Sequence, residues 1–338
     1  MRAMAARALV LVVLLSLTQD APRPPVGASA AALFDAYASG TNVDAAIAKA
    51  VAANGFVMDL KAGAAPWIEA VPAQMPRRRL VVAAVALEIA AADLRARAVQ
   101  QMLIPWGVSL LGKDPPSEGE RAWYRAAVAL TQRLADPFLN KLPAQALARF
   151  PDDERFQLAR VLLREQDSWR AVQAEQRTDR KGGAAILDAL AAELEALTPR
   201  APIEGEARLR LGHTYLRLDR HADAWAQLAR VEPLTRDRSL LYLTRYFSGR
   251  ARLAMGDAPG AAAAFRSALE LFPRAQSASF ALASLVYRGT DRAEAYALVD
   301  GALAGADGAT DPWRSYQEGD YRLWPDLVAA LRKQVRSE

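Results

Sequence analysis

Apolar residues recur along this 338-residue chain at the three- and four-residue spacing of helices rather than at the alternating spacing of strands. One such stripe lies between Gly182 and Pro199, and its members are Ile186, Leu187, Leu190, Leu194 and Leu197. Another helix is predicted to begin after Pro116, where Ser117 and Glu120 have the spacing of a capping box. Because paired Val, Ile and Thr runs around hairpin turns are missing, the pattern predicts an all-α chain of about fourteen helices.

Two apolar stretches raise the question of a membrane span. The run from Leu80 to Ala92 is interrupted by Glu88 and is better interpreted as a buried helix. The run from Ala8 to Leu17 follows two arginines and has about ten residues, whereas a spanning helix needs roughly twenty. Residues 1–30 are therefore predicted to be a secretory signal peptide with a cleavage site near Ala28-Ser29-Ala30, and the alternative is an uncleaved tether that provides the only membrane contact. We expect the mature protein to be exported, either periplasmic or secreted.

Three segments from residue 205 onward align with one another. Gly212, Gly249 and Ala283 occupy the same position in the three segments, at offsets of 37 and 34 residues. Each is predicted to let the second helix of its unit approach closely. The second helix has a small residue at the same contact: Ala224, Ala261 and Ala295. A larger residue four positions later packs against the next pair: Leu228, Phe265 and Val299.

This pattern resembles the tetratricopeptide repeat, and the resemblance covers residues 205–304. The second segment matches best, because its Gly, Ala, Phe and Ala and its terminal Pro273 all have the family's spacing. The third lacks the Gly and the terminal Pro, and the first two lack the family's Trp. The resemblance implies an α-solenoid of antiparallel helical hairpins from an exported bacterial protein of this superfamily. It divides the mature chain into degenerate hairpins over 31–200, three repeats over 201–304 and an aromatic C-terminal cap over 305–338.

Composition removes several kinds of chemistry. The chain has no cysteine, which excludes disulfides, cysteine-ligated metals and thiol nucleophiles. It has two histidines, His213 and His221, for which ordinary structural roles are expected rather than a metal pair. The formal charge of +5 falls to +3 without residues 1–30, and acids and bases alternate along most segments, so no nucleic-acid partner is predicted. We expect no cofactor and no metal.

A solenoid of helical hairpins presents one continuous surface made by the first helix of each unit, and that surface is the predicted partner site. Placing the three units in register gives a groove with aromatic residues and a basic edge, whose members are Leu209, His213, Arg217, Tyr246, Arg250, Phe280, Ser284, Tyr287 and Arg288. Such a groove suits a peptide with apolar anchors and a carboxylate, because arginine binds carboxylates with paired hydrogen bonds. The alternative is that the aromatic residues only pack between repeats.

The predicted function is a non-catalytic scaffold that binds a protein or peptide partner in the cell envelope. Trp313, Tyr316, Tyr321 and Trp324 are expected to belong to a capping segment over the last repeat, with a carbohydrate-stacking surface as the alternative. One alternative function is a helical envelope enzyme of the lytic transglycosylase type, which would need a glutamic acid in a cleft. Another is an accessory factor in assembly or secretion. The sequence does not fix the partner's identity or the oligomeric state.

Overall fold

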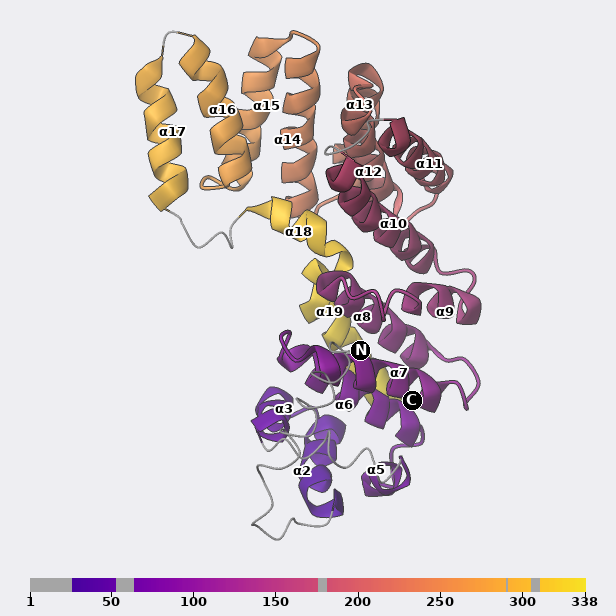
Figure 1. Cartoon of the computed structure of the whole chain (residues 1–338). Coiled ribbons are helices and arrows are strands. Elements are labelled where there is room, and N and C mark those ends of the chain that lie inside the picture. The colour runs from indigo at the N-terminus through magenta and orange to yellow at the C-terminus, as the bar shows by residue number, and fades with distance from the viewer. Residues whose placement is uncertain (1–25, 53–63, 176–180, 290, 305–310) are drawn as a thin grey trace, which may run out of the picture.

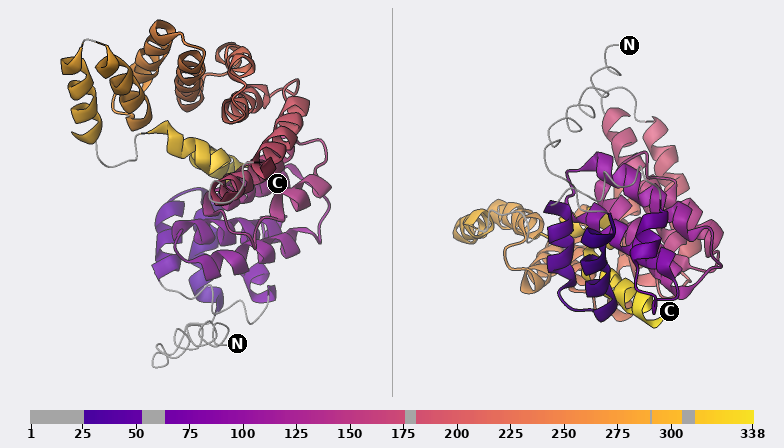
Figure 2. Two further views of the ribbon diagram at one scale, coloured as in Figure 1. Left: turned by 45° about the horizontal axis from the view of Figure 1, so that its top comes forward. Right: turned by 90° about the horizontal axis from the view of Figure 1, so that it is seen from below.

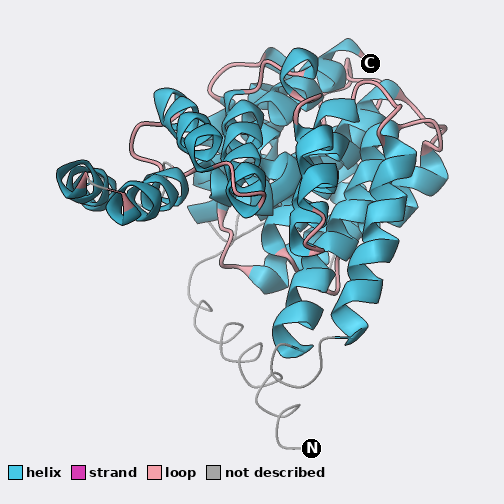
Figure 3. Cartoon of the chain, turned by 90° about the horizontal axis from the view of Figure 1, so that it is seen from above, coloured by secondary structure: helices cyan, strands magenta, loops and turns pink. Residues whose placement is uncertain are grey.

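The computed structural model describes residues 26–52, 64–175, 181–289, 291–304 and 311–338. Within these ranges the chain is α-helical with short 3₁₀ segments, and it has no strand (Figure 3). The predicted all-α fold is therefore confirmed, with seventeen α-helices in the described part rather than about fourteen. No described helix is both long enough and apolar enough to cross a membrane. Residues 1–25 of the predicted leader lie outside the described ranges.

The N-terminal half is a bundle built around one buried helix. Its helices are α2 (Val26–Ser39), α3 (Val43–Ala52), α5 (Ala65–Ala70), α6 (Arg78–Ala92), α7 (Arg97–Leu111), α8 (Glu118–Leu134) and α9 (Leu142–Arg149). All residues of α6 from Leu80 to Ala90 are buried, as the sequence predicts for an apolar helix that does not span a membrane. The one carboxylate among them, Glu88, is bound by Arg332. The predicted helix start at Ser117 is also confirmed, because the Ser117 hydroxyl accepts from the Glu120 N–H at 3.1 Å.

Antiparallel hairpins form the second half and curve into an arc, which Figure 2 shows from two sides. Its helices are α10 (Glu154–Glu175), α11 (Lys181–Leu197), α12 (Glu204–Arg217), α13 (His221–Leu228), the 3₁₀ segment η2 (Glu232–Leu234), α14 (Arg238–Ala254), α15 (Ala258–Leu271), α16 (Gln276–Arg288) and α17 (Arg292–Ala304). Helices α12 and α13, α14 and α15, and α16 and α17 pack as successive pairs. This is the solenoid of helical hairpins that the sequence predicts.

The glycines of the repeats lie where the two helices of a pair come closest. A Cβ atom on Gly249 would lie 2.5 Å from the Phe265 ring, and one on Gly212 would lie 2.7 Å from Leu228. Both distances are shorter than any van der Waals contact, so the large residue of the second helix needs the glycine opposite it. The turn after α14 passes through Gly256 at φ +86°, and the turn after α12 passes through Asp219 at φ +57°.

The prediction of a cap over the last repeat is wrong. The C-terminal segment consists of α18 (Pro312–Glu318), the 3₁₀ segment η3 (Gly319–Leu323) and α19 (Trp324–Ser337). Instead of covering α17, it runs back along the inside of the arc: α18 packs mainly on α14, and α19 packs mainly on α8 and α6 (Figures 1 and 2). Leu331 and Val335 of α19 are buried in the N-terminal core, so apolar surface draws the segment to that end of the molecule.

Candidate functional site

The inner face of the repeats has an open part and a covered part. The open face is the exposed side of α14 and α16, and its residues are Tyr246, Arg250, Leu253, Phe280, Ser284, Tyr287 and Arg288. They follow helical spacing, so they lie on one side of each helix. Phe280 is 42% exposed and Tyr287 is 47% exposed, whereas Tyr246 is half-buried against Tyr242 and Phe265. Six of the nine predicted groove residues belong to this face.

Leu209 and His213 do not line an open groove, and this part of the prediction is wrong. Leu209 is buried in the core of the repeats, and His213 is 2% exposed because α18 covers it. The His213 ring stacks on Phe247 at 4.5 Å between centroids and on Trp169 at 5.4 Å. Trp313 and Tyr316 of α18 meet it edge-on. The C-terminal segment of the same chain therefore occupies this part of the predicted groove.

Arg217 lies at the border of the covered part and is half-buried. Its guanidinium lies 4.6 Å from the centre of the Trp169 ring and donates to the Ser168 hydroxyl at 3.2 Å. It is thus already engaged by α10, unlike Arg250 and Arg288 on the open face.

Beneath α18, a buried ion pair fixes the position of Tyr316. Arg210 Nη1 donates to Glu165 Oε2 at 2.6 Å, and Arg210 Nη2 donates to the backbone carbonyl of Tyr316 at 3.1 Å. The Tyr316 hydroxyl donates to Glu165 and lies 2.8 Å from His213 Nδ1. Burial by itself would raise the pKa of Glu165, but Arg210, His213 and Tyr316 together lower it to about 2. Burial, with the nearby charges of Arg217 and Arg250, lowers the pKa of His213, so the ring is neutral.

A second buried cluster joins α12 to the end of the C-terminal segment. Glu206 on α12 is 3% exposed and accepts from Arg322 Nη2 at 2.6 Å and from Arg210 Nε at 3.1 Å. Arg155 lies between Glu206 and Asp320, at 3.4 and 3.0 Å. Burial would raise the pKa of Glu206, but the arginines, Arg322 first, hold it below its usual range. The cluster ties α10, α12 and η3 into one unit.

The open face is uniformly basic. Helices α14 and α16 contain five arginines and no Asp or Glu. Arg245 pairs with Glu232 at 3.0 Å, and Arg252 pairs with Asp257 at 3.5 Å. Among the described residues, no carboxylate lies within 4.0 Å of Arg250 or Arg288. Arg238 also makes no ion pair within the described ranges, but it donates to the Leu271 carbonyl at 2.5 Å. Arg250 and Arg288 are therefore the two arginines of the open face that have no carboxylate partner in the described part of the chain.

The sequence prediction missed the residues that close the covered part. Trp169 and Phe247 come from α10 and α14, and Trp313 and Tyr316 come from α18. The signal for them was an aromatic segment at residues 313–324 and a histidine at a groove position. These residues indicate a contact between the C-terminal segment and the repeats only if the segment is known to fold back onto them. Helical periodicity does not show this course of the chain.

The buried glutamates of the described part hold arginines. Glu120 binds Arg149 at 2.8 Å, and Glu88, Glu165 and Glu206 bind arginines in the same way. No group of three or more possible metal ligands is found among the described residues, and His221 is only partly exposed beside a turn. The glutamates thus have structural partners, and none of the four is held as a free acid.

Comparison with known proteins places few limits on this chain. It matches no known family and no curated protein sequence. Among solved structures, one titled "MamA MSR-1 C2" is similar at 17% sequence identity with a TM-score of 0.38, over 56% of this chain and 98% of that chain. The assignment of a helical-repeat solenoid rests on the packing of the hairpins described above.

Proposed function

We propose that this chain is a non-catalytic helical-repeat scaffold that binds an acidic, apolar-anchored peptide segment of a partner protein on its open face. The observation that carries the proposal is the combination of two arginines that have no carboxylate partner among the described residues, Arg250 of α14 and Arg288 of α16, with the exposed rings of Phe280 and Tyr287 on α16. A carboxylate of the partner would bind Arg250 or Arg288, and apolar side chains would pack on Phe280 and Tyr287.

The covered part of the same inner surface supports a peptide as the ligand. There the chain's own α18 lies against α12 and α14 as a short helix, held by two aromatic rings and by a backbone carbonyl bonded to Arg210. The open face begins where α18 starts, because Asp311 accepts from the backbone N–H of Ser277 at the first turn of α16, at 2.7 Å. A partner segment on the open face would continue along a surface that already binds a helix.

Selection from a displayed random peptide library against the purified protein tests the proposal. We expect the selected peptides to be enriched in Asp and Glu together with aromatic or large apolar residues. Phe280→Ala and Arg250→Glu should each weaken their binding by about tenfold or more, because each removes an exposed anchor. Affinity should also fall with added salt, since the arginines are exposed.

Two control variants match these changes elsewhere on the surface. Phe138→Ala removes a phenylalanine that is 63% exposed in the connection before α9, and Arg274→Glu reverses an exposed arginine before α16. Neither should change peptide affinity. The proposal fails if the selected peptides are not acidic, or if the controls weaken binding as much as the open-face variants do.

We further propose that the protein acts in the cell envelope or outside the cell. This rests on the charged and apolar pattern of residues 1–30. Fractionation of cells that produce the full chain, with mass spectrometry of the mature N-terminus, tests it. A full-length chain in the cytosol would contradict it, and a shortened chain in the envelope or medium is expected. Crosslinking in intact cells would then identify the partner and distinguish a general scaffold from an assembly or secretion factor.

A further inference from the structure

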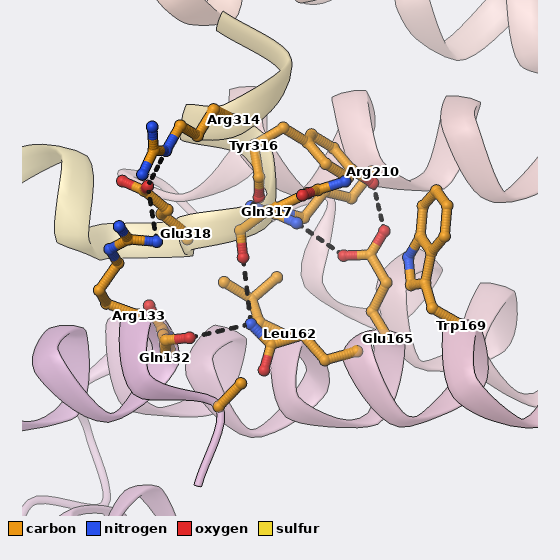
Figure 4. A pocket seen from close by; sticks show the side chains of 13 residues that line it. Gln132, Arg133, Leu162, Glu165, Trp169, Arg210, Arg314, Tyr316, Gln317 and Glu318 are labelled. Atoms are coloured by element: carbon orange, nitrogen blue, oxygen red, sulfur yellow. Dashed lines mark hydrogen bonds and ion pairs between the residues drawn. The ribbon is translucent and has the colours of Figure 1, made fainter. Parts of the chain in front are cut away.

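A cavity of about 390 Å³ lies where the C-terminal segment meets α8 and α10, away from the open face. Figure 4 shows it between the end of α8, one side of α10 and the turn from α18 into η3. Its volume is within the range of small-molecule sites, which is roughly 300 to 1,000 Å³. Arg133 and Arg314 lie at one end, and the Trp169 ring lies at the other end beside the ion pair of Glu165 and Arg210.

The arginine end has donors to spare. Arg133 Nη1 and Arg314 Nε both bind the same oxygen of Glu318, at 3.0 and 3.1 Å. Each guanidinium has five N–H donors, so most of them remain available to a second acceptor. Three arginines and two glutamates line the cavity, which leaves it one net positive charge. The other glutamate, Glu165, is already engaged by Arg210 and by the Tyr316 hydroxyl.

A buried amide adds to this excess of donors. Gln132 is 1% exposed, and its side-chain oxygen accepts from the Asp320 N–H at 2.7 Å. Its Nε2 has no acceptor among the described residues. Leaving such a donor unpaired costs about 1 to 3 kcal/mol, so an acceptor that binds the Gln132 amide would be favourable.

The opposite end has two apolar side chains beside the Glu165–Arg210 ion pair. Leu162 and Trp169 lie two turns apart on the same side of α10, and both line the cavity. The Trp169 ring is held in place by its contacts with His213, Trp313 and Arg217. A flat apolar group entering the cavity would therefore meet a preformed wall.

We propose that this cavity binds a small organic acid whose carboxylate reaches Arg133 and Arg314 and whose apolar or aromatic body lies along Leu162 and Trp169. The ligand must bring acceptors, because the wall has donors in excess, and it must bring an apolar body to fill the other end. Such a ligand would touch α8, α10 and α18 at once and would fasten the C-terminal segment to the rest of the chain.

Titration of the full-length protein with phenylacetate, indole-3-acetate and N-acetylphenylalanine tests the proposal, with calorimetry and tryptophan fluorescence as readouts. The matched neutral probes are the corresponding amides. We expect at least one acid to bind saturably below about 10 mM and its amide to bind at least about tenfold more weakly. The bound acid should also raise the thermal midpoint, because it binds only the folded chain.

Two arginine variants separate this cavity from nonspecific binding. Arg314 is exposed on α18, so Arg314→Gln should leave the fold intact and lower the affinity for the acid by about tenfold. Arg230→Gln removes an exposed arginine after α13 and should leave affinity unchanged. The proposal is overturned if none of the three acids binds, if acid and amide bind equally, or if the two variants behave alike. None of these outcomes bears on peptide binding at the open face, which the two variants do not touch.

Discussion

Replacing Glu206 by Gln tests whether the buried ion cluster holds the C-terminal segment in place. The substitution keeps the size of the side chain and removes its charge, so it isolates the electrostatic contribution. Glu206 is 3% exposed and faces Arg322 of the C-terminal segment, Arg210 of its own helix and Arg155 of α10. The variant leaves these guanidiniums buried with one carboxylate fewer.

The expected cost follows from the partners that remain. Removing one member of a buried ion pair typically costs about 3 to 5 kcal/mol, because the other charge stays buried. Arg210 keeps Glu165 at 2.6 Å, and Arg322 keeps Asp237 at 3.2 Å. These remaining pairs place the expected loss in the free energy of unfolding at the lower end, about 3 kcal/mol.

Urea unfolding, followed by both tryptophan fluorescence and circular dichroism, measures this loss. With a slope of about 3 kcal/mol per molar, the midpoint should fall by about 1 M. Glu204→Gln is the matched control two residues away, since Glu204 makes a partly exposed pair with Arg208 worth about 0.5 kcal/mol. If the two variants shift the midpoint equally, the cluster does not have the stabilising role assigned to it.

The stability difference between wild type and Glu206→Gln should also depend on pH. Because the folded pKa of Glu206 is lowered, its stabilising contribution is present above the unfolded pKa of about 4.3 and is lost as the pH falls through the folded pKa. The difference in unfolding free energy between wild type and Glu206→Gln should therefore narrow below about pH 4.3. A difference that stays constant at acid pH would contradict an ionised Glu206.

Two further predictions concern packing and the buried histidine. Gly249→Ala should lower the free energy of unfolding by about 1 to 3 kcal/mol, because its Cβ would overlap the Phe265 ring. Gly301→Ala places a Cβ in open space within α17 and should raise the free energy of unfolding by about 0.5 to 1 kcal/mol. The two variants should therefore shift the urea midpoint in opposite directions from wild type. Because the folded pKa of His213 is lowered, the unfolding free energy of the wild type should fall as the pH drops through about 6.5, by up to about 1.4 kcal/mol per pH unit. His213→Gln should reduce this dependence of the unfolding free energy on pH between about pH 7.5 and 5.5. An unchanged dependence would contradict a buried neutral ring.

Local features of this fold could be predicted from the sequence because each depends on residues close together in the chain. The capping of α8 by Ser117 needs only Glu120 three residues later. The pairing of Gly249 with Phe265 needs only the spacing of one hairpin. The exposed residues of the open face follow from the same register, since α14 and α16 repeat one pattern at an offset of 34 residues.

The course of the C-terminal segment depends on partners that are far away in sequence, and helical periodicity has no information about them. Arg322 forms an ion pair with Glu206, 116 residues away in sequence, and Arg332 forms one with Glu88, 244 residues away. Once α19 has buried Leu331 and Val335 in the N-terminal core, α18 must cross the inside of the arc to join it to the repeats. The covered part of the groove is therefore a consequence of where the tail is anchored. Because the segment is held at both ends by buried charges and apolar residues, a partner has the open face of α14 and α16 available without displacing it.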